Sequence, residues 1–326
     1  MSSLEATAGR QRDPPAPVDV DAADVLRLPA PSQRTRLGLA GAMVRATRPR
    51  QWMKNLLILA APGAAGVLDH GPVAVRVAMT LVAFCLLSAS TYLFNDLRDL
   101  EQDRLHPRKR FRPLAAGELS PRVAGVAGVA TALGGIGLAT AARPLAGGAA
   151  VLYLAVTAGY TLRGRDVPVL DALAIAAGFV VRALAGAAAA PVVVTLSFLL
   201  VTAGVAVFVV AGKRYAELRT LAGRPGATRP VLGTYTLTGL RRGLLLSAAV
   251  ACGAYVRWAA LRHEHGALPY NELSTVLFVA CLVRYGRLLV LGRGQAPEEL
   301  VLSDRLLAVL VLGWVGLFAL GVHAGD

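Results

Sequence analysis

Residues 92–103 read Tyr-Leu-Phe-Asn-Asp-Leu-Arg-Asp-Leu-Glu-Gln-Asp, a cluster of acids that closes a long apolar run. On an α-helix, Asp96, Asp99 and Asp103 would fall within an arc of roughly 60° on one face. Like charges at these spacings cost a helix roughly 0.2–0.5 kcal/mol per pair, so the run is unfavourable unless a cation sits there. Carboxylates shared with substrate phosphates suit Mg²⁺, and the run predicts a magnesium site. The alternative is that the acids only mark where a membrane helix enters water.

The composition places this acidic run in a membrane protein. The chain has 326 residues, of which 55% are hydrophobic, and its mean hydropathy is +0.56. Several apolar stretches approach the roughly 20 residues that span a bilayer as a helix. The net charge of +14 is concentrated in the loops, so we expect contacts with membrane lipid and no nucleic-acid partner. We therefore predict an all-α integral membrane protein.

Nine apolar spans can be placed along the chain. They cover approximately residues 55–69, 73–95, 121–141, 146–162, 168–190, 192–212, 243–261, 272–291 and 304–322. Beyond residue 54, most Lys and Arg lie in the segments 96–120, 163–167, 213–242 and 284–305. Because basic loops stay in the cytoplasm, the N-terminus and the acidic run are predicted to be cytoplasmic and the C-terminus external. We expect a multi-pass protein of the plasma membrane whose polar site faces the cytoplasm.

The N-terminal part precedes the spans. Residues 1–32 are rich in Pro, Ala, Asp and Arg and have no helical apolar period, which predicts a disordered cytoplasmic tail. Residues 33–48 are either an amphipathic helix in the membrane surface or a solvated linker. We expect residues 33–326 to form a single transmembrane catalytic domain.

Two basic segments lie on either side of the acidic run. The first, Arg48-Pro-Arg-Gln-Trp-Met-Lys-Asn55, precedes the first span, and Lys54 is its deepest cation. The second, residues 106–113, follows the carboxylates in the same loop and supplies Lys109, Arg110 and Arg112. Both signs of charge in one loop suit a metal-bridged polyphosphate, with Mg²⁺ on one side and Lys or Arg on the other. A purely topogenic role would explain the cations but not the adjacent acids.

The acidic run with its two basic segments is the first polar constellation, and two weaker ones, the second and the third, lie at other span ends. Residues 160–171 begin with Tyr160 and end with Asp171, and Arg182 follows about three helical turns later on nearly the same face. Ionisable residues inside a span usually face a polar cavity, so Arg182 is a candidate for binding an anion, with packing against a carbonyl as the alternative. The third constellation, residues 213–217 with Lys213 at its start, is also compatible with an ordinary charge cluster at a helix end.

Taken together, these motifs resemble the UbiA superfamily of intramembrane prenyltransferases. The resemblance covers about residues 40–323 and rests on the Asn-Asp-x-x-Asp-x-x-x-Asp run at 95–103, on residues 160–171 and on the nine-span plan. The segments 48–55, 106–113 and 212–217 are similar to the decaprenyl-phosphate phosphoribosyltransferase branch. The branch implies a UbiA-like bundle with a cytoplasm-facing polar chamber. It also implies transfer of 5-phosphoribosyl from phosphoribosyl pyrophosphate (PRPP) to decaprenyl phosphate, the first step of arabinose-donor synthesis for cell-wall arabinan.

The resemblance also implies roles for individual residues. Asn95 and Asp99 would hold Mg²⁺ with support from Asp96 or Asp103, and Asp171 joins these acids as a catalytic candidate. The residues expected to bind substrate are Lys54, Tyr92, Lys109, Arg110, Arg112, Tyr160, Arg165, Arg182 and Lys213. Because the nucleophile is already an anionic phosphate oxygen, the chemistry needs leaving-group neutralisation and alignment rather than a strong base.

The chain departs from the family pattern at two positions. Arg165 stands where the second motif is expected to carry Lys, and Ile175 stands where users of prenyl diphosphates carry a second acid. The second departure favours the phosphoribosyl branch over an aromatic prenyltransferase that uses a prenyl diphosphate. An ion-coupled transporter would place acids near the middle of its spans, whereas here they lie at span ends. The sequence leaves open whether the protein forms a homo-oligomer.

Overall fold

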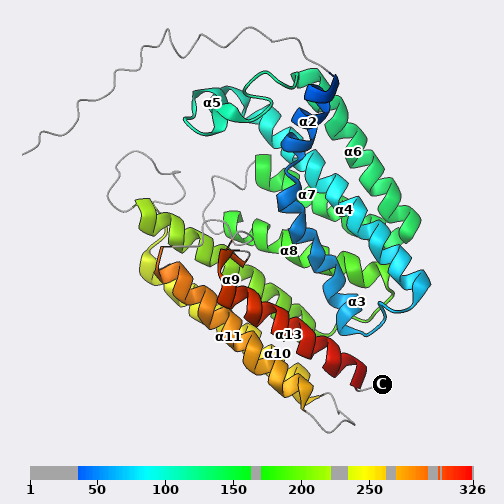
Figure 1. The fold of residues 1–326 in the computed structure, drawn as a ribbon, viewed down its shortest axis with the longest axis vertical. Coiled ribbons are helices and arrows are strands. Elements are labelled where there is room, and N and C mark those ends of the chain that lie inside the picture. Colours follow the sequence, from blue (N-terminus) through cyan, green and yellow to red (C-terminus); the bar gives the residue numbers. More distant parts are fainter. Residues whose placement is uncertain are drawn as a thin grey trace, which may run out of the picture.

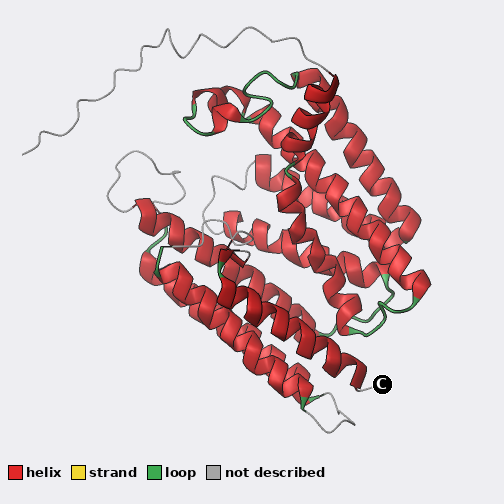
Figure 2. Cartoon of the chain, viewed as in Figure 1, coloured by secondary structure: helices red, strands yellow, loops and turns green. Residues whose placement is uncertain are grey.

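Helices account for all the regular structure in the described part of the chain, as Figure 2 shows. The computed structural model describes residues 36–162, 170–221, 234–261, 269–292, 300–301 and 303–324. The helices are α2 (Arg36–Thr47), η1 (Pro49–Leu59), α3 (Ala60–Ala64), α4 (Gly71–Arg98), α5 (Leu100–Leu105), η2 (Lys109–Phe111), α6 (Pro121–Ala142), α7 (Pro144–Leu162), α8 (Leu170–Ala189), α9 (Leu196–Leu221), α10 (Leu237–Ala260), α11 (Tyr270–Val290) and α13 (Arg305–Ala324). The predicted tail 1–32 and Arg165 lie outside the described residues.

Eight helices of the described chain are long and apolar enough to cross a membrane, namely α4, α6, α7, α8, α9, α10, α11 and α13. They match eight of the nine predicted spans and confirm the all-α, multi-pass prediction. The other predicted span, 55–69, overlaps the 3₁₀ helix η1 of 11 residues and α3 of 5 residues, which follow each other directly. At about 2.0 Å per 3₁₀ residue and 1.5 Å per α residue, the two cover about 30 Å, the thickness of a hydrocarbon core. A 3₁₀ winding therefore lets a short segment reach as far as a longer α-helix.

Local sequence signals set the starts of two of these helices. Ser120 Oγ accepts a hydrogen bond from the backbone N–H of Val123 at 3.3 Å, and Pro121 occupies the first position of α6. Thr236 caps α10 in the same way, by accepting from the N–H of Gly239 at 3.0 Å. Such caps satisfy N–H groups that have no partner inside the helix, so these helices begin directly after a hydroxyl residue.

The long helices form two groups, which Figure 1 shows as the blue-to-green and the yellow-green-to-red parts of the ribbon. In the first group, α4, α6, α7 and α8 pack around Phe84, Leu87 and Tyr153, and η1 adds Ile58 to this core. In the second group, α9, α10, α11 and α13 enclose further clusters that include Tyr255 and Leu288. Contact between α8 and α9 joins the groups. The chain thus builds two helical halves with η1 and α3 beside them.

Helix α2 packs onto the first group beside the acidic run. Ala42 and Ala46 are buried, and Ala46 belongs to a cluster with Leu93 of α4 and Leu119. The helix predicted over 33–48 is therefore present at 36–47. Its location in the membrane surface stays a prediction.

The three polar constellations reach the same end of the bundle, which we name the motif end. Helices α4, α7 and α9 finish there, and α6, α8 and α10 start there. Because consecutive spans run in opposite directions, segments far apart in the sequence arrive side by side. The motif end lies in the upper part of Figure 1, where α5 projects from the bundle.

Candidate functional site

The acidic run is divided between two helices. Helix α4 ends at Arg98, Asp99 links it to α5, and α5 starts at Leu100. The continuous helix face expected over the three aspartates is therefore interrupted at Asp99, whose backbone leaves the helical region with φ −91° and ψ 9°. In the described residues, no three acid, His or Cys side chains lie close enough together to form a metal centre by themselves.

Arg112 connects the two buried aspartates of this run. Asp96 and Asp103 are 3% and 1% exposed. Arg112 Nη1 lies 3.2 Å from Asp96 Oδ1 and 2.5 Å from Asp103 Oδ2. Lys109 Nζ approaches Asp103 Oδ1 to 3.7 Å. Carboxylates this deep need such partners, and the structure brings together the acidic run and the basic segment that follows it.

Arg48 completes this cluster and was missed as a site residue by the sequence reasoning. It forms an ion pair with Asp96, and its guanidinium lies over the ring of Tyr92 at 4.9 Å from the centroid. The backbone of Arg48 is left-handed, with φ +53°, directly before η1. The signal was its place at the head of the first basic segment, where Lys54 was selected instead. Arg110 is exposed and stacks on Phe111 rather than joining the cluster.

The second constellation touches the first through a hydrogen bond between the ends of two helices. Thr161 Oγ1 donates to Asn95 Oδ1 at 2.9 Å. Thr161 is followed directly by the last residue of α7, so the end of α7 is held against the end of α4. This contact orients the Asn95 side chain, which directly precedes Asp96 on α4.

The second and third constellations are joined by a buried ion pair. Asp171 and Arg214 are each 2% exposed, and Arg214 Nη2 lies 2.5 Å from Asp171 Oδ2. Arg214 also donates to Glu217 Oε2 at 2.5 Å and interacts electrostatically with Tyr160. The sequence reasoning chose Lys213, which is half-buried, instead of Arg214. Neighbours on a helix point about 100° apart, and only packing decides which of them turns inward.

Arg182 lies apart from the acidic cluster, deep in the first helical group. It follows Asp171 by eleven residues along α8, which corresponds to about 16 Å. Its Nε donates to Asn55 Oδ1, its Nη1 to the carbonyl of Gly178 and its Nη2 to Tyr153 Oη, each at 2.8 Å. These partners are all neutral. The structure therefore does not bring Arg182 together with the other predicted donor-binding residues.

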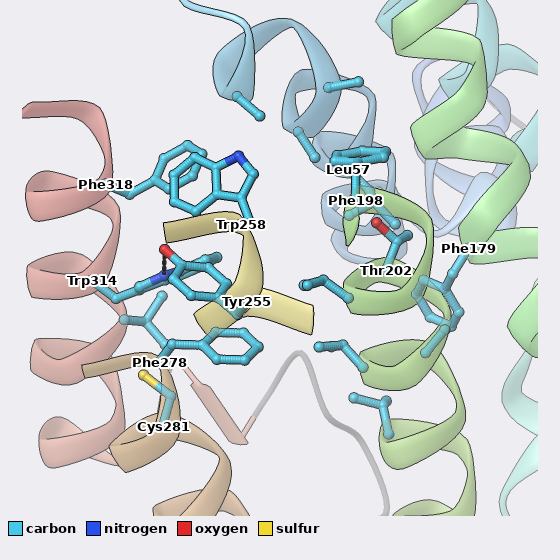
Figure 3. A pocket seen from close by; sticks show the side chains of 18 of the residues that line it. Leu57, Phe179, Phe198, Thr202, Tyr255, Trp258, Phe278, Cys281, Trp314 and Phe318 are labelled. Carbon is cyan, nitrogen blue, oxygen red and sulfur yellow. Dashed lines mark hydrogen bonds between the residues drawn. The ribbon is translucent and has the colours of Figure 1, made fainter. Parts of the chain in front are cut away.

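A large apolar cavity lies between the two helical groups, with a volume of about 670 Å³. Figure 3 shows Tyr255, Trp258 and Trp314 on one side of it and Leu57 and Phe179 on the other. Tyr255 is fixed by hydrogen bonds with Trp314 Nε1 and Ser274 Oγ, both at 2.9 Å.

Lys54 is the cationic residue of the cavity wall, whose other members are apolar or uncharged. Its Nζ donates to Gln51 Oε1 at 2.5 Å. Lys54 follows Arg48 by six residues, so about 12 Å of η1 separates the apolar cavity from the ion pair with Asp96. This arrangement suits an amphiphilic molecule with an anionic head and a long apolar tail.

Two buried carboxylate oxygens at the motif end are unsatisfied in the described part of the chain. Asp103 Oδ1 and Asp171 Oδ1 are buried and have no hydrogen-bond partner among the described residues. An unsatisfied buried carboxylate oxygen is costly, and a hard cation that prefers oxygen ligands would remove that cost. The donor set at the motif end, carboxylates and the Asn95 amide, has the chemistry that Mg²⁺ requires.

Comparison with known proteins identifies relatives along most of the chain. The profile of the UbiA prenyltransferase family matches residues 56–309. The decaprenyl-phosphate phosphoribosyltransferase of Corynebacterium glutamicum is 40% identical over 292 residues, which cover 87% of this chain and 88% of the relative. The enzyme of the same name from Mycolicibacterium smegmatis is 39% identical over 303 residues, covering 87% and 93%.

The fold also resembles solved structures. A UbiA homolog from Archaeoglobus fulgidus bound to GPP and Mg²⁺ has a TM-score of 0.66, with 87% of this chain and 98% of that chain covered. The two sequences are 20% identical, so this likeness concerns the fold alone.

Proposed function

This chain belongs to the UbiA prenyltransferase family, and from that premise we propose that it is the transferase that moves 5-phosphoribosyl from PRPP to decaprenyl phosphate. The products are decaprenylphosphoryl-5-phosphoribose and pyrophosphate. The two relatives with this name share about two fifths of their residues with the chain over nearly their whole length. The reaction would supply the arabinose donor for cell-wall arabinan.

One observation carries the proposal, namely that a cluster of buried charges of both signs lies beside an apolar cavity that has a lysine in its wall. PRPP is a soluble polyanion, whereas the acceptor carries one phosphate on a long apolar tail. A site that joins them needs cations for the first and an apolar chamber for the second. Arg48, Lys109 and Arg112 provide the cations, and Lys54 stands between the two environments.

The bond changes need little acid–base help. The C1–O bond from ribose to pyrophosphate breaks, and a bond forms between C1 and an oxygen of the lipid phosphate. That oxygen is already anionic, so the protein must mainly hold the reactants in line and neutralise the leaving group. Tyr92, Lys109, Arg110, Arg112, Tyr160, Arg165 and Lys213 are the residues proposed for the donor, whereas Arg182 lies apart from them. Lys54 is proposed for the phosphate of the lipid.

The acids of the motif end are proposed as the metal site. Asn95 and Asp99 would hold Mg²⁺, with Asp96 or Asp103 in support, and Asp171 would complete the anionic side of the site. When bound there, Mg²⁺ would supply positive charge to the leaving pyrophosphate. Arg48 pairs with Asp96, and Arg112 pairs with both Asp96 and Asp103, so these buried carboxylates are held in place by neighbouring cations.

The orientation in the membrane follows from the charge of the loops. The segments at the motif end carry most of the Lys and Arg, and such loops stay in the cytoplasm. We therefore place the donor site at the cytoplasmic face of the plasma membrane, where PRPP is available. The lipid acceptor would enter the site from the bilayer.

Mass spectrometry of the lipid product tests this proposal. Purified protein is incubated with PRPP and polyprenyl phosphate in one reaction and with a prenyl diphosphate and hydroxybenzoate in a second. A phosphoribosyl lipid in the first reaction alone is expected. A prenylated aromatic product in the second reaction would assign the chain to the aromatic prenyltransferases instead.

A further inference from the structure

One face of η1 and α3 lines the cavity and another is buried. Met53, Lys54 and Leu57 of η1 and Ala60 and Ala61 of α3 line the cavity, whereas Asn55 and Ile58 of η1 have no exposed surface. Lys54 and Asn55 are neighbours in the chain, so contacts that fix Asn55 also fix the direction in which Lys54 points.

Asn55, on the buried face of η1, makes the hydrogen bonds that hold this segment against its neighbours. Asn55 Oδ1 accepts from Arg182 Nε at 2.8 Å, and Asn55 Nδ2 donates to Ser88 Oγ at 3.3 Å. Arg182 is itself held by the Gly178 carbonyl and by Tyr153 Oη. One asparagine thus ties η1 to α4 and α8, and through Arg182 to α7. Hydrogen bonds to a charged group are among the stronger ones, and breaking one leaves a buried cation without a partner.

A second contact fixes η1 one turn deeper. A Cβ atom at Gly186 of α8 would overlap the carbonyl oxygen of Ile58. Glycine at this position therefore allows the backbone of η1 to lie directly on α8. Asn55 and Gly186 together hold η1 at two points about one 3₁₀ turn apart, since Ile58 follows Asn55 by three residues.

We propose that Asn55 and Arg182 are positioning residues, which hold η1 against α4, α7 and α8 so that Lys54 faces the cavity and meets the phosphate of the acceptor. This inference rests on the proposed function, because Lys54 is the residue proposed there for the lipid phosphate. It assigns Arg182 a positioning role, which agrees with the three neutral partners of its guanidinium group. Direct contact between Arg182 and PRPP is the competing outcome.

Steady-state kinetics with both substrates varied tests the inference. Asn55→Leu removes the acceptor for Arg182, and we expect it to raise KM for polyprenyl phosphate about tenfold while KM for PRPP stays within about twofold. Asn55→Asp keeps an oxygen for Arg182 and adds a counter-charge, so its KM for the lipid should remain within about threefold of wild type. Ser90→Ala is the matched control, because it loses a buried hydrogen bond to the Gly128 carbonyl without touching η1, and its kinetics should be unchanged.

A second variant covers the case in which Asn55→Leu does not fold. Gly186→Ala pushes the backbone of η1 away from α8 and leaves both Asn55 and Lys54 in the chain, so it should show the same selective rise in KM for the lipid. A rise in KM for PRPP in Arg182→Gln or Asn55→Leu would overturn the inference and make Arg182 a donor ligand. Unchanged kinetics in Asn55→Leu and Gly186→Ala would also overturn it. Absence of phosphoribosyl transfer by the wild type would instead refute the proposed function.

Discussion

Removing Arg214 should destabilise the protein by an amount that its buried partner determines. The side chains of Asp171 and Arg214 are 2% and 3% exposed and lie 2.5 Å apart. Arg214→Gln leaves the Asp171 carboxylate without its cation in a place that water barely reaches. Breaking a buried ion pair on one side typically costs about 3–5 kcal/mol, because the remaining charge stays desolvated. Taking about 2 °C per kcal/mol, the low end for large domains, the unfolding temperature should fall by about 6–10 °C.

A double variant separates the structural part of this effect from the chemical part. Asp171→Asn combined with Arg214→Gln removes both charges, and neutral replacements of buried pairs are often nearly neutral in stability. We therefore expect the double variant to recover most of the lost unfolding temperature. It should still lack turnover, because Asp171 belongs to the proposed site for the donor and metal.

Heating in detergent with tryptophan fluorescence as the readout measures the first quantity, since the chain contains three tryptophans. Mass spectrometry of the lipid product measures the second. An Arg214→Gln protein as stable as the wild type would contradict the assigned burial of this pair. Normal turnover by the double variant would mean that Asp171 and Arg214 have a structural role alone.

Three further predictions concern the metal, the donor and the acceptor. Asp99→Asn should abolish turnover while the protein remains folded, because it removes a negative charge that would hold Mg²⁺. Excess EDTA should also stop the wild type, and turnover that survives EDTA would refute the metal site. Rising ionic strength should raise KM for PRPP and leave KM for the lipid nearly constant, since screening weakens attraction between the donor and the cations of the motif end. A KM for PRPP that does not change with salt would contradict a polar chamber for the donor at the motif end. Thr202→Phe, which fills part of the cavity in Figure 3, should raise KM for polyprenyl phosphate severalfold with little change for PRPP; equal effects on both substrates would argue against a tail in this cavity. In addition, a Cys placed at Lys109 should react with an impermeant thiol reagent only from the cytoplasmic side, and labelling from the outside would reverse the proposed orientation.

Most of the fold could be predicted from the sequence because hydrophobic length and loop charge are local properties. Apolar runs of about 20 residues predict the spans, and the structure places helices at eight of the nine. The acidic run, the segment 106–113 and Lys54 could be selected for the same reason, since each stands at the end of an apolar run. The acidic run and the basic segment 106–113 are separated by only a short loop, so their contact at Asp103 could be expected from the sequence.

The partners of these residues were decided by tertiary packing alone. Arg214 rather than Lys213 pairs with Asp171, because the way in which α9 packs on α8 selects which helix face turns inward. Arg182 was found from sequence as a charge inside a span, but its partners Asn55 and Tyr153 come from helices more than twenty residues away in the chain. The place of η1 against α4 and α8 has no local signature either, since it depends on the hydrogen bonds of Asn55 and on the close approach of Ile58 to Gly186. The sequence by itself determined which chemistry is present and at which end of the bundle, whereas the distances that join these groups exist only once the helices have packed, because they depend on side chains from several elements at once.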